Sequence, residues 1–374
     1  MLLIETLVII SVAIYSIVAV RFLFASIKSR SASGISSEIT ERRILTVIPF
    51  RNEEKIIQHT LHNVIREVKN DKNCKLILVD SASSDNGAEL AQNILEESEL
   101  EDNNWKLIVS EKPGKGLALN AGMADLFADD IVMMIDADAL VSENSFQRIR
   151  KWLENEEIGA VSAQEQILPG SFMSEYKIRS NILRNYESSL GSTPMLEGSQ
   201  LAWDPYRIGW KSFDERNNAD DLQVSLCSIR SGHRSVVDSK LTYLDVRKPV
   251  SQEFSKFVRR SQGINQQLCS NLDLIFRKNT SSLRYTLISN LLLHTVMPWC
   301  TVVLLAAPFF FPIWQINPEN TNSIILTFLP SFLLVASQLF PIGRSLTTGS
   351  AATIIGQFRA LLGRQNSHWN PRGD

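Results

Sequence analysis

Residues 131–139 read IVMMIDADA, an uninterrupted apolar run that ends in two closely spaced carboxylates. A run without polar alternation is typical of a strand buried on both faces. In an extended chain the side chains at i and i+2 point the same way, which would bring Asp136 and Asp138 together at the strand end. Two close carboxylates are costly unless a cation lies between them, and a hard divalent ion with oxygen ligands is the natural partner. Taken alone, however, these letters fit a strand and a solvated acidic turn better, so the rest of the chain has to decide.

The composition is that of a chain with one sizeable core and additional elements. It has 374 residues, of which 44% are hydrophobic and 21% charged, and a formal net charge of -2. The near-neutral charge argues against a nucleic-acid binder, which normally has a basic face. The four cysteines (Cys74, Cys227, Cys269 and Cys300) match no zinc spacing, so we expect free thiols in a reducing compartment.

Strand and helix patterns alternate along the chain on both sides of residues 131–139. Strands are predicted at 44–48, 75–79, 105–109, 131–135 and 158–163, and helices at 53–68, 85–95, 115–127 and 143–153. This alternation predicts an α/β fold with a mostly parallel central sheet. Such sheets bind ligands beyond the carboxyl ends of their strands.

Polar motifs follow each of the first four strands, and all four would lie along that edge. They are TVIPFRNEE (46–54), VDSASSDNG (79–87), GKGLALNAG (114–122) and DADA (136–139). Each has an ordinary explanation: Asp85 as a helix N-cap, Lys115 as a solvated charge, Gly114 and Gly116 as turn glycines. The P-loop and the G-x-G-x-x-G dinucleotide fingerprint are both absent.

Taken together and in this order, the motifs resemble the GT-A catalytic domain of a family-2 glycosyltransferase, over about residues 44–267. The resemblance implies a nucleotide-sugar donor, such as a UDP- or GDP-sugar. It places Asp80 on the base or ribose, with Pro49 and Glu53 in the adjoining donor loop, and Lys115 and Asn120 near the nucleotide. It also implies that Asp138, with Asp136, holds Mg²⁺ or Mn²⁺ on the donor diphosphate. A metal of this kind would stabilise the leaving group as a Lewis acid.

The second half of the domain resembles the acceptor half of the same family. Gly198-Ser199 is followed by Phe213-Asp214-Glu215 and then by Asp220-Asp221-Leu222, which opens a predicted helix. The resemblance implies that Asp221 is the general base of a single, inverting displacement, with Asp220 beside the acceptor or diphosphate. Alone, the acidic pair would be explained by the helix macrodipole.

Two departures from the family pattern bear on the acceptor. Ala202-Trp203-Asp204-Pro205 stands where relatives often carry an arginine. Residues 257–263, FVRRSQG, fall where processive relatives have Gln-x-x-Arg-Trp. Arg259 matches that arginine, but the tryptophan is missing, which favours the addition of one or a few sugars. Arg259 and Arg260 are expected either at the diphosphate or on a basic face near the membrane.

Three apolar stretches predict an integral membrane protein. Leu2–Val20 is long enough to span a bilayer, and basic residues follow rather than precede it, which argues against a cleaved signal peptide. Leu291–Trp314 and Ile324–Ile342 predict a second and a third span. The charge bias predicts that the N-terminus lies outside and that the catalytic domain and the C-terminus are cytoplasmic. Thr353–Leu362 could form a helix on the membrane surface.

The predicted organisation is therefore a membrane anchor, a linker, a GT-A domain, a transmembrane helix pair and a cytoplasmic tail, over residues 1–25, 26–43, 44–275, 285–345 and 346–374. The leading hypothesis is a membrane-bound inverting glycosyltransferase that acts on a lipid or lipid-linked acceptor. One alternative is a processive polysaccharide synthase. A second is a non-catalytic membrane scaffold that keeps a transferase fold.

Overall fold

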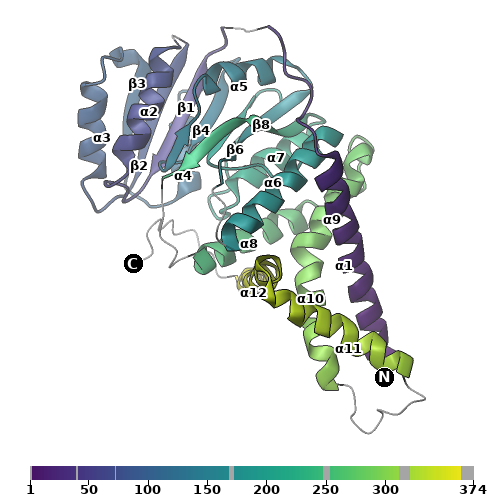
Figure 1. Cartoon of the computed structure of the whole chain (residues 1–374). Coiled ribbons are helices and arrows are strands. Elements are labelled where there is room, and N and C mark those ends of the chain that lie inside the picture. The colour runs from purple at the N-terminus through teal and green to yellow at the C-terminus, as the bar shows by residue number, and fades with distance from the viewer. Residues whose placement is uncertain are drawn as a thin grey trace.

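The computed structural model describes residues 2–38, 41–71, 73–167, 172–246, 253–310 and 321–363. An α/β domain stands on one end of a group of long helices, with α12 between the two parts (Figure 1). The helices are α1 (Leu2–Lys28), α2 (Ile57–Lys69), α3 (Gly87–Glu96), α4 (Lys115–Gly122), α5 (Ser145–Glu154), α6 (Phe172–Leu190), α7 (Asp220–Arg230), α8 (Glu253–Ser270), α9 (Arg284–Leu291), α10 (Met297–Ala306), α11 (Thr321–Ala336) and α12 (Pro341–Leu361).

A single eight-stranded sheet forms the centre of the α/β domain, in the order β3-β2-β1-β4-β7-β6-β8-β5. The strands are β1 (Ile44–Phe50), β2 (Cys74–Ser81), β3 (Trp105–Ser110), β4 (Ile131–Ile135), β5 (Ala139–Val141), β6 (Ile158–Glu165), β7 (Gln200–Trp203) and β8 (Arg234–Asp245). All five predicted strands are present. The sequence patterns missed β5, β7 and β8, which are short or interrupted by polar residues.

The prediction of a mostly parallel sheet is wrong, because the sheet is mixed. β3, β2, β1 and β4 are mutually parallel, but β7 runs antiparallel to both β4 and β6. The chain enters β7 at the carboxyl end of β4, where the amide of Asp136 donates to the carbonyl of Ser199 (3.0 Å). β7 must therefore run back along β4. This also brings residues 197–199 to the edge where the DADA motif lies.

Alternating side chains of the central strands build a core on each face of the sheet. On β1, Ile44 and Ile48 pack toward α2, α3 and α5, whereas Leu45 and Val47 pack toward α4 and α7. Both faces of β1 and β4 are fully buried. This explains why IVMMI lacks the alternation of a half-exposed strand.

The close packing of α4 on the sheet depends on Gly122, where the helix predicted for 115–127 ends. A Cβ added at Gly122 would overlap one methyl group of Val47 and lie 3.2 Å from the other. We expect Gly122→Ala to lower the free energy of unfolding by about 1–3 kcal/mol, since β-branched Val47 is buried and cannot yield. Chemical denaturation measures this. Gly349→Ala is the matched control, because an added Cβ there meets no atom within 4 Å. Equal stability of the two variants would contradict this account.

Within the described residues, two helices are long and apolar enough to cross a membrane. They are Leu3–Lys28 and the continuous stretch Arg284–Phe310, which includes a π-helical turn at Leu292–Val296. They overlap the first two predicted spans, Leu2–Val20 and Leu291–Trp314, and the end of the second, after Phe310, lies outside the described residues. The third predicted span, Ile324–Ile342, is only partly confirmed. Ile324–Leu339 and Gly343–Leu361 pass the test together only as a pair bent by 108°. Phe340 is extended and precedes Pro341, which disfavours a helical conformation at Phe340 and ends the straight segment.

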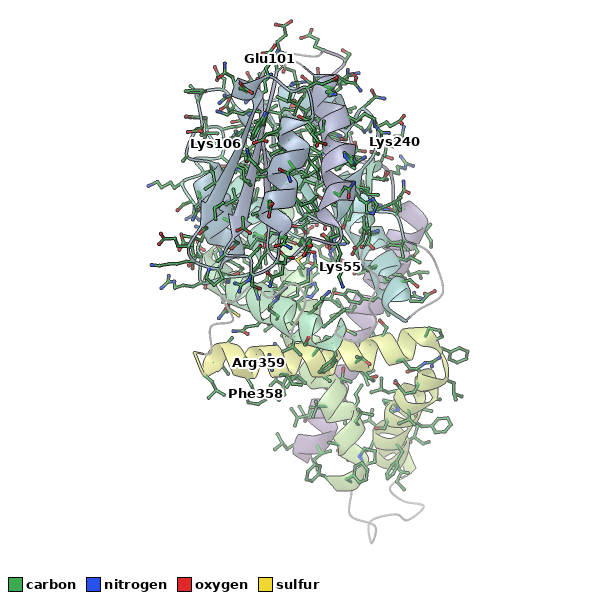
Figure 2. The ribbon with its side chains drawn as sticks, turned by 90° about the vertical axis from the view of Figure 1, so that its left-hand side faces the viewer. Lys55, Glu101, Lys106, Lys240, Phe358 and Arg359 are labelled. Atoms are coloured by element: carbon green, nitrogen blue, oxygen red, sulfur yellow. The ribbon has the colours of Figure 1, made fainter. Side chains whose placement is uncertain are left out.

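The bend sends α12 across the underside of the α/β domain, and Phe358 and Arg359 lie near one end of it (Figure 2). The predicted surface helix is thus the end of a longer one. α12 lies directly against α8: a Cβ at Gly356 would be 2.8 Å from the carbonyl oxygen of Val258. Large apolar residues stay exposed on other parts of α12, namely Ile355, Phe358 and Leu361.

Candidate active site

The loops after β1 and β2 hold each other in place. The amide of Asn52 donates to Ser83 Oγ (3.0 Å), and Asn52 Oδ1 accepts from the amide of Ser84 (2.7 Å). The amide of Glu54 donates to Asp85 Oδ2 (3.0 Å), so Asp85 links the two loops, and its Oδ1 accepts from the amide of Gly87 at the start of α3 (3.1 Å). Asn52 has a positive φ of 52°. Asparagine tolerates this conformation better than most residues, which lets the loop turn back over the sheet edge.

Asp80 lies at the end of β2 within this pair of loops. Its side chain is buried and accepts hydrogen bonds from the amide of Ser83 (3.2 Å) and from the Ser83 hydroxyl. Burial raises the pKa of Asp80, while the bonds from Ser83 oppose the shift. Pro49 pairs with Val79 on the neighbouring strand, and the carbonyl of the fully buried Glu53 accepts the amides of Ile56 and Ile57 before α2. In this structure, Pro49 and Glu53 shape the loop that adjoins Asp80.

Lys115 connects three segments of the site. Its Nζ lies 2.7 Å from Asp136 Oδ1, after β4, and 2.7 Å from Asp220 Oδ2, at the start of α7. Burial lowers the pKa of Lys115, but the two carboxylates outweigh it and hold the pKa above its ordinary value. Lys115 therefore stays charged and joins the side of the site predicted for the donor to the side predicted for the acceptor.

The DADA segment is a tight turn rather than a continued strand, which corrects the geometric premise of the sequence prediction. β4 ends at Ile135, and the amide of Ala139 donates to the carbonyl of Asp136 (3.0 Å). Both oxygens of Asp136 are engaged, Oδ1 with Lys115 and Oδ2 with the hydroxyl of Ser199 (3.1 Å). Asp138 is mostly buried two residues further on, and its carbonyl accepts the amide of Val246 (2.9 Å).

The carboxylates of this turn suit a divalent ion in kind but do not enclose one by themselves. Over the ranges that the structure describes, no group of three or more His, Cys, Asp or Glu side chains is arranged to hold a metal. Carboxylate oxygens are the ligands that Mg²⁺ and Mn²⁺ prefer, and Mg²⁺ is commonly bound by one or two carboxylates together with substrate phosphates. The residues present therefore fit a metal that is completed by a bound diphosphate.

Asp221 begins α7 beside Asp220 and faces Arg260 of α8. Arg260 Nη2 lies 3.8 Å from Asp221 Oδ2 and also 3.8 Å from Glu197 Oε2. Burial raises the pKa of Asp221 to about 6, with Arg260 lowering it and Asp220 raising it further. A carboxylate with a pKa near 6 is ionised at neutral pH and is a stronger base than an ordinary aspartate.

Two predicted site residues have other partners in this structure. Asn120 holds the segment before α7, because it accepts from the amide of Phe213 (2.8 Å) and donates to the Phe213 carbonyl (3.1 Å) and to Glu215 Oε1 (3.2 Å). The backbone carbonyl of Arg259 accepts from Asn218 Nδ2 (3.0 Å). The nucleotide and diphosphate contacts assigned to them stay predictions.

Sequence reasoning missed the role of Glu197. Its Oε1 forms an ion pair with Arg184 of α6, and its Oε2 accepts from the hydroxyl of Tyr243 on β8 (3.4 Å). The only hint of this role in the sequence was the position of the glutamate, directly before the Gly198-Ser199 motif. Its partners, however, lie on other elements, Arg184 on α6 and Tyr243 on β8, and no local pattern reports such contacts.

Comparisons with known proteins identify a family and several relatives. The model of glycosyl transferase family 2 matches residues 46–210. The chain is 33% identical over 152 residues to poly-β-1,6-N-acetyl-D-glucosamine synthase of Staphylococcus aureus, a match that covers 40% of this chain and 31% of the synthase. It is 35% identical over 99 residues to undecaprenyl-phosphate 4-deoxy-4-formamido-L-arabinose transferase of Proteus mirabilis, covering 26% and 29%. The chain thus spans about a third of the length of these curated relatives.

The fold is shared over nearly the whole chain with a mannosyltransferase from Pyrobaculum calidifontis, solved in complex with GDP-Man and Mn²⁺. The TM-score is 0.76 at 21% identity, and the match covers 96% of this chain and 99% of the other. This likeness shows a GT-A-like fold. The family match and the curated relatives identify residues 46–210 as a domain of glycosyl transferase family 2.

Proposed function

We propose that this protein is a membrane-bound glycosyltransferase that moves a sugar, with inversion, from a nucleoside-diphosphate sugar to an acceptor held at the membrane. The observation that carries the proposal is the ion bridge of Lys115. It joins Asp136, from the predicted donor motif, to Asp220, which adjoins the predicted base Asp221. A donor and an acceptor bound on the two sides of this bridge would meet at one sheet edge.

The donor side would be built by the loops after β1, β2 and β4. Asp80 would contact the base or ribose, and Asp138, with Asp136, would hold the metal at the diphosphate. When bound, Mg²⁺ or Mn²⁺ would neutralise the charge that grows on the leaving diphosphate. The mannosyltransferase of the same fold, described in complex with GDP-Man and Mn²⁺, supports a nucleotide sugar and a divalent ion as ligands.

On the acceptor side, Asp221 would take the proton of the attacking hydroxyl. The oxygen then forms a bond to the anomeric carbon while the bond from that carbon to the diphosphate breaks, which inverts the configuration. The raised pKa of Asp221 suits this role, because a base with a pKa of about 6 accepts a proton more readily than an ordinary aspartate and remains ionised at pH 7. Lys115 balances the charge of Asp220 beside it.

The acceptor we propose is a lipid or a lipid-linked glycan. The helices that are apolar enough to span a membrane adjoin the α/β domain, and one relative is named for its action on undecaprenyl phosphate. The basic residues after the first apolar stretch support a cytoplasmic catalytic domain. The relatives named as polysaccharide synthases support a second candidate, a processive enzyme, which the length of the product distinguishes.

The test is a screen of the purified full chain in detergent against UDP-, GDP- and dTDP-sugars, with Mn²⁺ or Mg²⁺ and a membrane lipid extract. Release of nucleoside diphosphate with one donor, together with a lipid-extractable product, is expected. The absence of both release and donor binding would contradict the proposal and favour a non-catalytic scaffold. Binding without release would direct the search to other acceptors.

The metal assignment makes a separate prediction for Asp138. We expect Asp138→Asn to weaken donor binding in the presence of Mn²⁺ by about tenfold or more, which corresponds to about 1.4 kcal/mol or more. The reason is that an amide is a poorer ligand for a hard cation than a carboxylate. Titration calorimetry with and without EDTA measures the effect. Asp129→Asn is the control, because Asp129 is exposed and Asn tolerates its positive φ of 70°. Metal-dependent binding that survives in Asp138→Asn would contradict the assignment.

A further inference from the structure

Arg260 lies between two carboxylates and forms a direct hydrogen bond with neither. Its Nη2 is 3.8 Å from Glu197 Oε2 and 3.8 Å from Asp221 Oδ2. Both separations exceed the 2.7–3.2 Å of an N–H···O hydrogen bond but remain within the reach of an ion pair. The Arg260 side chain is 55% exposed, so it has room to move toward either partner.

Glu197 is the fixed member of this arrangement. It is almost fully buried, it forms an ion pair with Arg184, and it accepts a hydrogen bond from the Tyr243 hydroxyl (3.4 Å). Its backbone amide donates to Ser162 Oγ of β6 (3.1 Å). The next residue, Gly198, lies against α7, since a Cβ added there would be 3.6 Å from Asp221 Cβ. Glu197 and Asp221 are therefore held by the framework, and Arg260 is the movable charge between them.

From this geometry we infer that Glu197 is a positioning residue, which acts as a counter-charge that keeps Arg260 from closing onto Asp221. A direct hydrogen-bonded ion pair would occupy an oxygen of Asp221 and make it a weaker base, because a charged partner stabilises the ionised form. By sharing the guanidinium, Glu197 leaves that oxygen available to the acceptor hydroxyl. The inference rests on the proposed function, in which Asp221 is the base.

Other charges surround these groups and remain in place when Glu197 is changed. Asp221 is influenced by Asp220, Lys115 and Arg260. Arg260 is influenced by Asp221, Glu197, Tyr243 and Tyr176. Among these groups, only Glu197 is a carboxylate that draws Arg260 away from Asp221. Its neutralisation therefore moves Arg260 in one direction, toward Asp221.

The experiment is to record pH profiles of kcat/KM for the full chain and for Glu197→Gln. The glutamine keeps the shape and an acceptor for Arg184 but loses the charge. We expect the acidic limb to move down by about one pH unit, as expected when an opposite charge closes on a carboxylate. The plateau should fall about three- to tenfold, because a base of lower pKa removes a proton less readily. Glu197→Asp, which restores the charge, should return the limb toward that of the wild type.

Glu165→Gln is the matched control, because Glu165 is a half-buried glutamate at the end of β6 that is paired with Lys177 (2.6 Å) instead of Arg260. The acidic limb of the kcat/KM profile of Glu165→Gln should stay at the pH of the wild type. A limb of Glu197→Gln that stays in place or moves up would overturn the inference. A structure of Glu197→Gln gives a readout that does not depend on activity: Arg260 should lie within about 3 Å of Asp221. An inactive wild type would count against the proposed function, whereas an unmoved Arg260 would count against this inference alone.

Discussion

Asp221→Asn is expected to reduce sugar transfer by about 10²–10⁴-fold, which is the usual contribution of a positioned general base. The amide keeps the size of the side chain and can still accept a hydrogen bond, but it cannot take the proton of the acceptor hydroxyl. Donor binding should stay within a few-fold of the wild type, because the loops assigned to the donor follow β1, β2 and β4 rather than α7. The measurements are single-turnover transfer and calorimetric donor binding on the same preparation.

The other end of the same helix offers a control for Asp221→Asn. Asp273 is half-exposed and pairs with Arg230 in the last turn of α7 (2.7 Å) and with Arg277 (2.9 Å). Asp273→Asn makes the same chemical change on a carboxylate that contacts α7 but lies far from its first turn, and it should leave the rate nearly unchanged. If Asp221→Asn transferred sugar at the wild-type rate, or lost the donor altogether, the assignment of the base would be wrong.

The pH dependence follows from the same group. Burial raises the pKa of Asp221 to about 6, so below that pH the carboxyl is protonated and cannot act as a base. The rate of transfer should therefore rise about tenfold per unit as the pH increases toward 6 and level off above it. This limb should be absent from the residual activity of Asp221→Asn. A limb near pH 4, where an ordinary aspartate titrates, would show that burial does not shift this group in the working enzyme.

Local patterns in the sequence predicted the parts of the site that a single strand–loop–helix unit builds. Asp80, Lys115 and Asp136 each follow or begin an element that apolar periodicity indicates clearly, and the parallel order of the first four strands brings them to one edge. The family resemblance then connected these loops to Asp220 and Asp221. In the structure, Lys115 lies between Asp136 and Asp220, and the roles assigned to these residues stay predictions.

The remaining features depend on contacts between distant segments, which no local pattern reports. β7 is a four-residue strand, and it is antiparallel because of where the chain enters the sheet. The carboxylate of Glu197 has partners on α6, α8 and β8. The turn at Asp136 depends on hydrogen bonds with Ser199, 63 residues later. The bend before α12 had a local signal in Pro341, but apolar length alone predicted a straight span.

Glu187→Ala is expected to destabilise the protein by about 3–5 kcal/mol, which is the cost of leaving a buried charge without its partner. Arg21, near the end of α1, forms an ion pair with Glu187 of α6, and both side chains are only 2% exposed. Glu187 also accepts from Asn290 Nδ2 of α9 (2.8 Å) and from the hydroxyl of Thr193. This cluster joins α1, the α/β domain and the start of the second long apolar helix. The melting temperature in detergent should fall by about 4–6 °C, since the entropy of unfolding scales with chain length.

The double variant Arg21→Met/Glu187→Met distinguishes two effects: the loss of the ion pair, and the cost of leaving one buried charge without a partner. Apolar replacement of a buried ion pair is often neutral or stabilising, so the double variant should regain most of the stability that Glu187→Ala loses. If the double variant were as unstable as Glu187→Ala, the ion pair itself would supply the stability. If neither variant lost stability, α1 would be only loosely held to the α/β domain. The expected recovery would show that α1 is part of the folded unit rather than a tether. A truncation that removes Arg21 should then leave the buried Glu187 without its ion-pair partner and destabilise the domain in the same way.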